Sequence, residues 1–146
     1  MSAADVLMKP AECVMLPVDF QAGLGFGVES TSRQVVLNNA VALARTVVAF
    51  KVPVIASTSA SRVYSGPLLP PLQEVLPSVK AIERKSMNVW EDDAARNAVV
   101  ATERRRLIVA GFLTEACVAP RHDRDAGKRR KRNDGNSWSD LLRRPG

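Results

Sequence analysis

The stretch RLIVAG at residues 106–111 is the clearest strand signal in this chain of 146 residues. A continuous apolar run of this length is typical of a strand that is buried on both faces. The run CVMLPV at residues 13–18 has the same character. Pro17 lies inside that run, and proline favours the edges or ends of sheets because it has no N–H to donate. We therefore predict a strand in both places, with the one at 13–18 less regular.

The sequence between these two strands alternates between helical and extended patterns. Helices are predicted at 34–50, at 72–76 and at 91–102, where acidic residues in the first turn complement the helix dipole. Strands are predicted at 52–56 and 79–82, and the loops at 22–32 and 58–70 are expected to shape a pocket. This alternation predicts an α/β fold with a parallel sheet and covering helices. The apolar positions of the first helix are Val36, Ala40, Leu43, Val47 and Phe50.

The net charge of +6 is unevenly distributed along the chain. Residues 1–119 contain 12 Lys and Arg against 11 Asp and Glu, whereas residues 120–146 contain 9 against 4. Only four side chains in 121–146 are apolar, which is too few for a buried face, and the composition is typical of a disordered segment. We divide the chain into a domain at 1–119 and a basic, disordered tail at 120–146.

The basic tail has two interpretations. The run RRKR at 129–132 is typical of a nuclear-localisation or nucleic-acid patch. Trp138 stands alone, however, so aromatic residues are not interleaved with the basic ones as stacking platforms for bases. We favour a solvated tail without a dedicated partner, and we expect no nucleic-acid partner.

Composition argues against several classes of protein. No apolar run approaches the roughly 20 residues that span a bilayer, and residues 1–12 lack the basic start and apolar core of a secretory signal. Two cysteines, Cys13 and Cys117, are too few for a disulfide scaffold and are not spaced as zinc ligands. We expect a cytoplasmic protein with no membrane partner and no cofactor.

Three groups of polar residues follow predicted strands, at the edge where parallel sheets bind ligands. They are Asp19, the pair Arg84 and Lys85, and the segment 114–117, which ends in Cys117. A cation or a helix N-terminus can lower the pKa of a thiol, and a carboxylate can accept its proton. We therefore interpret Cys117 as a nucleophile whose pKa lies well below that of free cysteine, with Asp19 as its general base. Taken singly, the alternatives are a buried apolar cysteine, a turn aspartate and a surface arginine.

Three ordered motifs carry a resemblance to a known family. They are VDFQ at 18–21, the arginine at 84 followed by MNVWED at 87–92, and AGFLTEACV at 110–118; SGPL at 65–68 also fits. From about residue 13 to residue 119 the chain resembles the isochorismatase-like cysteine hydrolases, and within them the YcaC-type branch. The resemblance implies a three-layer αβα fold with a parallel sheet in the strand order 3-2-1-4-5-6.

The resemblance also implies a catalytic triad and a reaction. The acid is Asp19, the nucleophile is Cys117 and the basic residue is Arg84, with Lys85 as the alternative. Together they would hydrolyse an amide-type carbon–nitrogen bond of a small-molecule substrate in a homo-oligomeric enzyme. A non-proline cis peptide that shapes the oxyanion hole is expected between Phe112 and Leu113, and the residues expected to contact the substrate are Gln21, Asn88 and Trp90.

Two departures from the family pattern limit these expectations. The metal-binding branch uses histidines after the second strand, whereas the single histidine here is His122, in the tail; no metal is expected. The family normally continues after the cysteine with a helix and two more strands, but here the basic tail follows. We expect a domain without its last strands and interpret 120–146 as a frameshift product. The alternative function is an inactive fragment or pseudoenzyme whose tail binds polyanions non-specifically.

Overall fold

Four parallel strands form the centre of the protein. The computed structural model describes residues 7–28, 31–112 and 117. Within them the sheet has the order β3-β2-β1-β4, so the predicted α/β fold and the first four positions of the strand order are confirmed. The strands are β1 (Cys13–Val18), β2 (Ser57–Ser59), β3 (Ile82–Arg84) and β4 (Arg106–Gly111).

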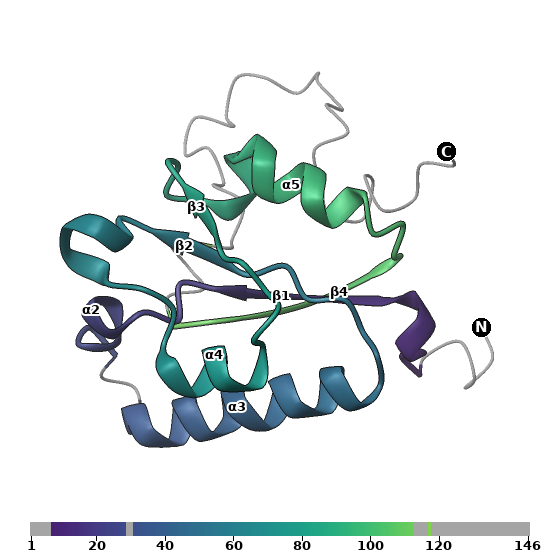
Figure 1. Ribbon diagram of the computed structural model, residues 1–146, viewed down its shortest axis with the longest axis horizontal. Helices are drawn as coiled ribbons and strands as arrows, with labels where there is room; N and C mark the ends of the chain where they lie inside the picture. Colours follow the sequence, from purple (N-terminus) through teal and green to yellow (C-terminus); the bar gives the residue numbers. More distant parts are fainter. Residues whose placement is uncertain (1–6, 29–30, 113–116, 118–146) are drawn as a thin grey trace, which may run out of the picture.

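Helices cover both faces of the sheet. Figure 1 shows α3 and α4 on one face and α5 on the other, which makes three layers. The α-helices are α2 (Ala22–Gly25), α3 (Arg33–Ala49), α4 (Pro70–Val75) and α5 (Asp93–Val100). Three short turns complete the described part: the 3-10 turns η1 (Pro10–Glu12) and η3 (Val89–Glu91), and the π-helical turn η2 (Ser61–Ser65).

Strand β1 divides its side chains between two cores because successive residues of a strand point to opposite faces. Val14, Leu16 and Val18 belong to a buried cluster that contains Ala95 and Val99 of α5. Cys13 and Met15 pack on the other face with Val47 and Val52. All six residues of β1 are buried, as expected for a continuous apolar run.

Pro17 explains where β2 begins. The Met15 N–H donates to the Pro53 carbonyl, and the Asp19 N–H donates to the Ser57 carbonyl. Pro17 lies midway between these two donors, and Ile55 lies midway between the two acceptors. Because proline has no N–H, Pro17 cannot donate a hydrogen bond to the Ile55 carbonyl. The pairing of the two strands is interrupted there. The predicted strand at 52–56 is therefore wrong: Val54 makes an isolated bridge to Met15, and β2 starts only at Ser57.

The other differences from prediction are local. β3 lies at 82–84 and not at 79–82, because it pairs with the displaced β2. The predicted loop at 22–32 contains α2, and the helix predicted at 91–102 is shorter and preceded by η3. Phe50 is 61% exposed because it follows the last turn of α3, whereas the helix buries Ala40 and Val47 as predicted.

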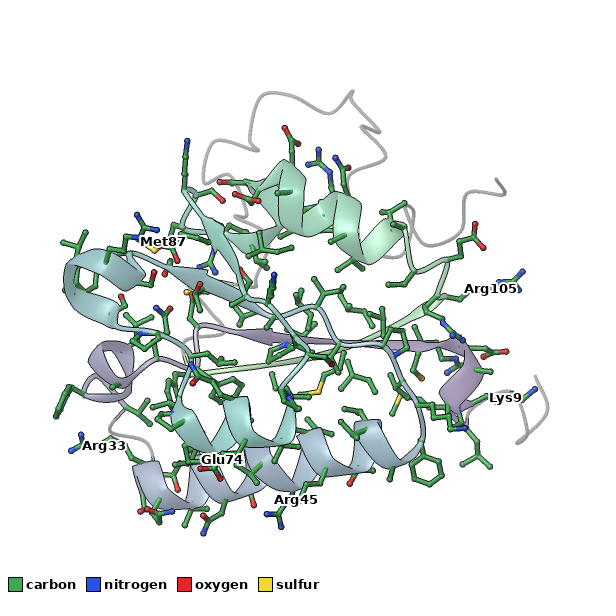
Figure 2. The ribbon with its side chains drawn as sticks, viewed as in Figure 1. Lys9, Arg33, Arg45, Glu74, Met87 and Arg105 are labelled. Atoms are coloured by element: carbon green, nitrogen blue, oxygen red, sulfur yellow. The ribbon has the colours of Figure 1, made fainter. Side chains whose placement is uncertain are left out.

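The charged residues of the periphery point outward. Figure 2 shows Lys9, Arg33, Arg45, Glu74 and Arg105 projecting away from the sheet. Within the described residues, no helix combines the length and the apolar character that crossing a membrane requires. The tail at 120–146 lies outside the described residues, so the predictions made for it stay predictions.

Candidate active site

Asp19 follows β1 at the carboxyl edge of the sheet. Its backbone has φ +56°, in the left-handed region, which aspartate tolerates better than most residues. Its N–H donates to the Ser57 carbonyl at 2.9 Å, and the residue is 1% exposed. The turn at Asp19 therefore fixes a buried carboxylate beside the start of β2.

Arg84, the last residue of β3, holds that carboxylate in a two-pronged ion pair. Its Nη1 and Nη2 donate to the two carboxylate oxygens of Asp19 at 2.7 and 2.5 Å. Nη1 also donates to Ser57 Oγ at 3.0 Å, Nη2 to the Met87 carbonyl at 2.9 Å and Nε to the Ser86 carbonyl at 3.0 Å. A guanidinium has five N–H donors, and each of the five has an acceptor here. These bonds hold Arg84 in one orientation and provide partners for a charged group that is only 3% exposed.

The segment after β3 is shaped to present those carbonyl groups. Ser86 Oγ donates to the Asn88 carbonyl, and the Trp90 N–H donates to Asn88 Oδ1, both at 2.8 Å. Asp92 caps α5 by accepting from the Ala95 N–H at 3.0 Å. Figure 2 shows Met87 at the same edge of the sheet as the ends of β2 and β3. The acceptors of Arg84 thus belong to a segment fixed by its own side chains.

Cys117 reaches the Asp19–Arg84 pair from beyond β4. Its side chain is buried with Val14, Leu16 and Val18 on the α5 face of β1. Burial, followed by the neighbouring Asp19 carboxylate, raises the pKa of the Cys117 thiol to about 11, against the opposing effect of Arg84. The pKa of Arg84 is also raised: burial lowers it, but the hydrogen bond and charge of Asp19, with a smaller contribution from Cys117, outweigh burial.

These pKa shifts correct one sequence-based expectation. The sequence predicted a thiol pKa well below that of free cysteine, because the prediction considered the nearby cation. It did not include the burial of the thiol or the negative charge of Asp19, which both raise the pKa. In the structure the thiol is protonated at neutral pH. A nucleophilic Cys117 therefore needs a base at the moment of attack, and Asp19 is the carboxylate that contacts it.

Gln21, a predicted substrate contact, has partners inside the protein for both polar atoms of its side-chain amide. Gln21 donates from Nε2 to the carbonyls of Ser59 and Gly66 at 3.1 and 2.5 Å, and its Oε1 accepts from the Ser59 N–H at 3.0 Å. Its amide ties the ends of β1 and β2 together. Lys85, the alternative to Arg84, is exposed, and the structure places Arg84 and not Lys85 on the aspartate.

The remaining predicted residues lie near the same edge. Asn88 and Trp90 are buried in the segment that follows β3. Phe112 packs edge-on against Phe20 with ring centroids 4.9 Å apart. Leu113 is outside the described residues, so the cis peptide expected between Phe112 and Leu113 stays a prediction.

Ser57 is a site residue that the sequence prediction missed. The strand assigned to 52–56 ended before it, so nothing marked Ser57 as a neighbour of Asp19. The signal that could have revealed it is Pro17, which displaces the pairing toward 57. No group of three or more His, Cys, Asp or Glu side chains able to hold a metal ion occurs among the residues that the structure describes.

The comparison with protein families decides the classification. The Isochorismatase domain family matches residues 13–128. The chain belongs to the isochorismatase family. The probable hydrolase YcaC of Escherichia coli strain K12 is 36% identical over 115 residues, which are 78% of this chain and 55% of that protein. The chain thus spans about half the length of the curated relative that it matches.

Solved structures show the same fold. The crystal structure of YcaC from Escherichia coli, described as an octameric hydrolase of unknown specificity, matches with a TM-score of 0.73 and 36% identity over 77% of this chain and 56% of that one. YcaC from Pseudomonas aeruginosa, with hexane-2,5-diol and covalent acrylamide, matches with a TM-score of 0.72 and 36% identity over 75% of this chain and 55% of that one. A ribonuclease from Caenorhabditis elegans, 13% identical with a TM-score of 0.65 over 75% of this chain and 55% of that one, shares the fold alone.

Proposed function

We propose that this chain is a cysteine hydrolase that cleaves an amide-type carbon–nitrogen bond of a small molecule. One observation carries the proposal: the Cys117 thiol lies against the Asp19 carboxylate, to which both terminal nitrogens of Arg84 donate hydrogen bonds. A nucleophile beside a base that a third group orients is the arrangement of covalent hydrolytic catalysis. Membership of a family whose relatives are named hydrolases supports it.

The reaction uses Asp19 as a proton carrier. As Cys117 Sγ forms a bond to the carbonyl carbon, the thiol proton passes to the carboxylate of Asp19. The proton then moves to the leaving nitrogen, and the carbon–nitrogen bond breaks to give a thioester. Water, deprotonated by Asp19, attacks that thioester, the carbon–sulfur bond breaks, and the acid product leaves as the thiol regains its proton.

Arg84 acts on this cycle through charge and position. Its guanidinium pairs with both carboxylate oxygens of Asp19 and fixes the orientation of that buried side chain. The same positive charge lowers the pKa of Cys117 and opposes the effect of burial. It therefore stabilises the thiolate that forms during attack without supplying a proton.

Acrylamide alkylation tests the proposal. The β-carbon of acrylamide accepts Cys117 Sγ, and the thiol proton ends on the α-carbon. Because only the thiolate reacts and the pKa is about 11, the rate should rise about tenfold per pH unit toward pH 11. Asp19→Asn removes a cause of the raised pKa, so alkylation at pH 8 should become faster while hydrolysis of simple amides, followed by ammonia release, is lost.

The adduct is located by peptide mass spectrometry in a Cys13→Ala background, since Cys13 is the second free thiol. A profile that levels off near the pKa of free cysteine, about 8.5, would contradict the assignment. So would slower alkylation in Asp19→Asn, or amide hydrolysis that survives that substitution.

A further inference from the structure

We infer that Ser57 is a positioning residue for the Asp19–Arg84 pair, an inference that rests on the proposed function. Ser57 contacts both partners with different atoms. Its hydroxyl oxygen accepts from Arg84 Nη1 at 3.0 Å, and its carbonyl accepts from the Asp19 N–H at 2.9 Å. No other residue with a described side-chain bond to Arg84 also holds the backbone of Asp19.

The place of Ser57 in the fold gives these contacts their effect. It is the first residue of β2, paired with Val18 on one side and Ile82 on the other. It therefore stands between the strand that leads to Asp19 and the strand that ends in Arg84. Ser57 is fully buried, so water does not replace its hydroxyl when that group is removed.

The hydroxyl fixes the orientation of the guanidinium. Nη1 has two N–H groups, of which one goes to Asp19 Oδ1 and the other to Ser57 Oγ. Without the second acceptor, one buried Nη1 proton has no partner, and the four remaining hydrogen bonds hold the guanidinium less firmly against Asp19. Because the charge of Arg84 lowers the pKa of the Cys117 thiol, a guanidinium that is less firmly placed raises that pKa further and slows thiolate formation.

Substitution at Ser57 tests this role through the pH profile of acrylamide addition to Cys117. Ser57→Ala should shift the profile upward by about half a pH unit, which slows alkylation about threefold at any pH below the pKa. Ser57→Thr keeps the hydroxyl and should restore the wild-type profile. The matched control is Thr58→Ala, which removes a buried hydroxyl from the same strand. That hydroxyl bonds Glu83 and not Arg84, so the pH profile of Thr58→Ala should equal that of wild type.

Two results overturn the inference: a wild-type profile in Ser57→Ala, or an equal shift in Thr58→Ala. If Ser57→Ala does not fold, nitrogen-15 NMR of the wild-type chain decides. Both Nη1 protons of Arg84 should appear as separate, slowly exchanging signals, and a single averaged Nη1 signal overturns the inference. Absence of any Cys117 adduct in wild type would instead refute the proposed function, and the NMR result would still report on Ser57.

Discussion

The two edges of β1 are held in different ways. Along β4 the backbone holds the two strands together. Six consecutive residue pairs are in register, from Cys13 with Arg106 to Val18 with Gly111. Along β2 the register is a single pair, Val18 with Ser57, and an isolated bridge. A few backbone hydrogen bonds cross this edge, and side chains add to them. Gln21 bonds Ser59, and Arg84 of β3 reaches Asp19.

This difference shows how one proline shapes the candidate site. In an uninterrupted ladder, the backbone N–H and C=O groups of adjoining strands bond one another. Pro17 removes one donor on the β2 edge only, because alternate residues of a strand direct their N–H groups to opposite neighbours. Buried polar side chains join the strands beyond that interruption, and Asp19 and Arg84 of the proposed catalytic centre are among them.

A second proline one residue before Pro17 should have the largest effect. Leu16→Pro removes an N–H that faces β4, because Met15 and Asp19 direct theirs toward β2. It also deletes a fully buried side chain. The loss of core packing together with an unpaired buried carbonyl should cost about 4 kcal/mol or more of the free energy of unfolding, measured by urea denaturation.

Leu16→Ala is the control for the loss of the side chain alone. It should cost about 2–5 kcal/mol and retain the register between β1 and β4. An equal cost for Leu16→Pro and Leu16→Ala would show that the β4 edge does not depend on its backbone ladder.

Removing the charge of Arg84 should have the next largest effect. Arg84→Met leaves the buried Asp19 carboxylate unpaired, which should lower the free energy of unfolding by about 3–5 kcal/mol. The comparison is Arg96→Met, which breaks the exposed ion pair with Asp93 and should cost about 0.5 kcal/mol or less. Urea denaturation at pH 7 measures both, and equal costs would mean that the site side chains do not hold the β2 edge.

Restoring the missing donor should have the smallest effect on stability. Pro17→Val allows a hydrogen bond to the Ile55 carbonyl, worth about 1 kcal/mol, but it also frees the unfolded chain at a cost of about 0.4–1 kcal/mol. The net change should be within about 0.5 kcal/mol. Hydrogen exchange should show a protected amide at position 17, and rapid exchange there would contradict our account of the gap between β1 and β2.

The sequence allowed prediction of the elements whose signal is local. The bounds of β1 and β4 agree with the predicted strands because both are continuous apolar runs. β2 and β3 were misplaced because their positions depend on a gap opposite Pro17, which is a property of the pairing and not of either segment. For the site, the motifs placed Asp19, Arg84 and Cys117 at strand ends, and the structure brings them together.

Other features of the site had no sequence signal. The acceptors at Ser86 and Met87 are backbone carbonyls, which every residue carries. The raised thiol pKa depends on burial and on the distance to Asp19, neither of which a motif specifies. That Arg84 uses both of its terminal nitrogens on Asp19 is likewise a matter of geometry that no motif specifies.

The fully engaged guanidinium of Arg84 has a consequence for selectivity. Every one of its N–H groups is used inside the protein, so a carboxylate or phosphate arriving with a ligand finds no docking point there. Discrimination between charged and neutral compounds must therefore come from groups other than Arg84. Two family members with an identical Asp–Arg–Cys centre can consequently differ in the compounds they accept without any change at that centre.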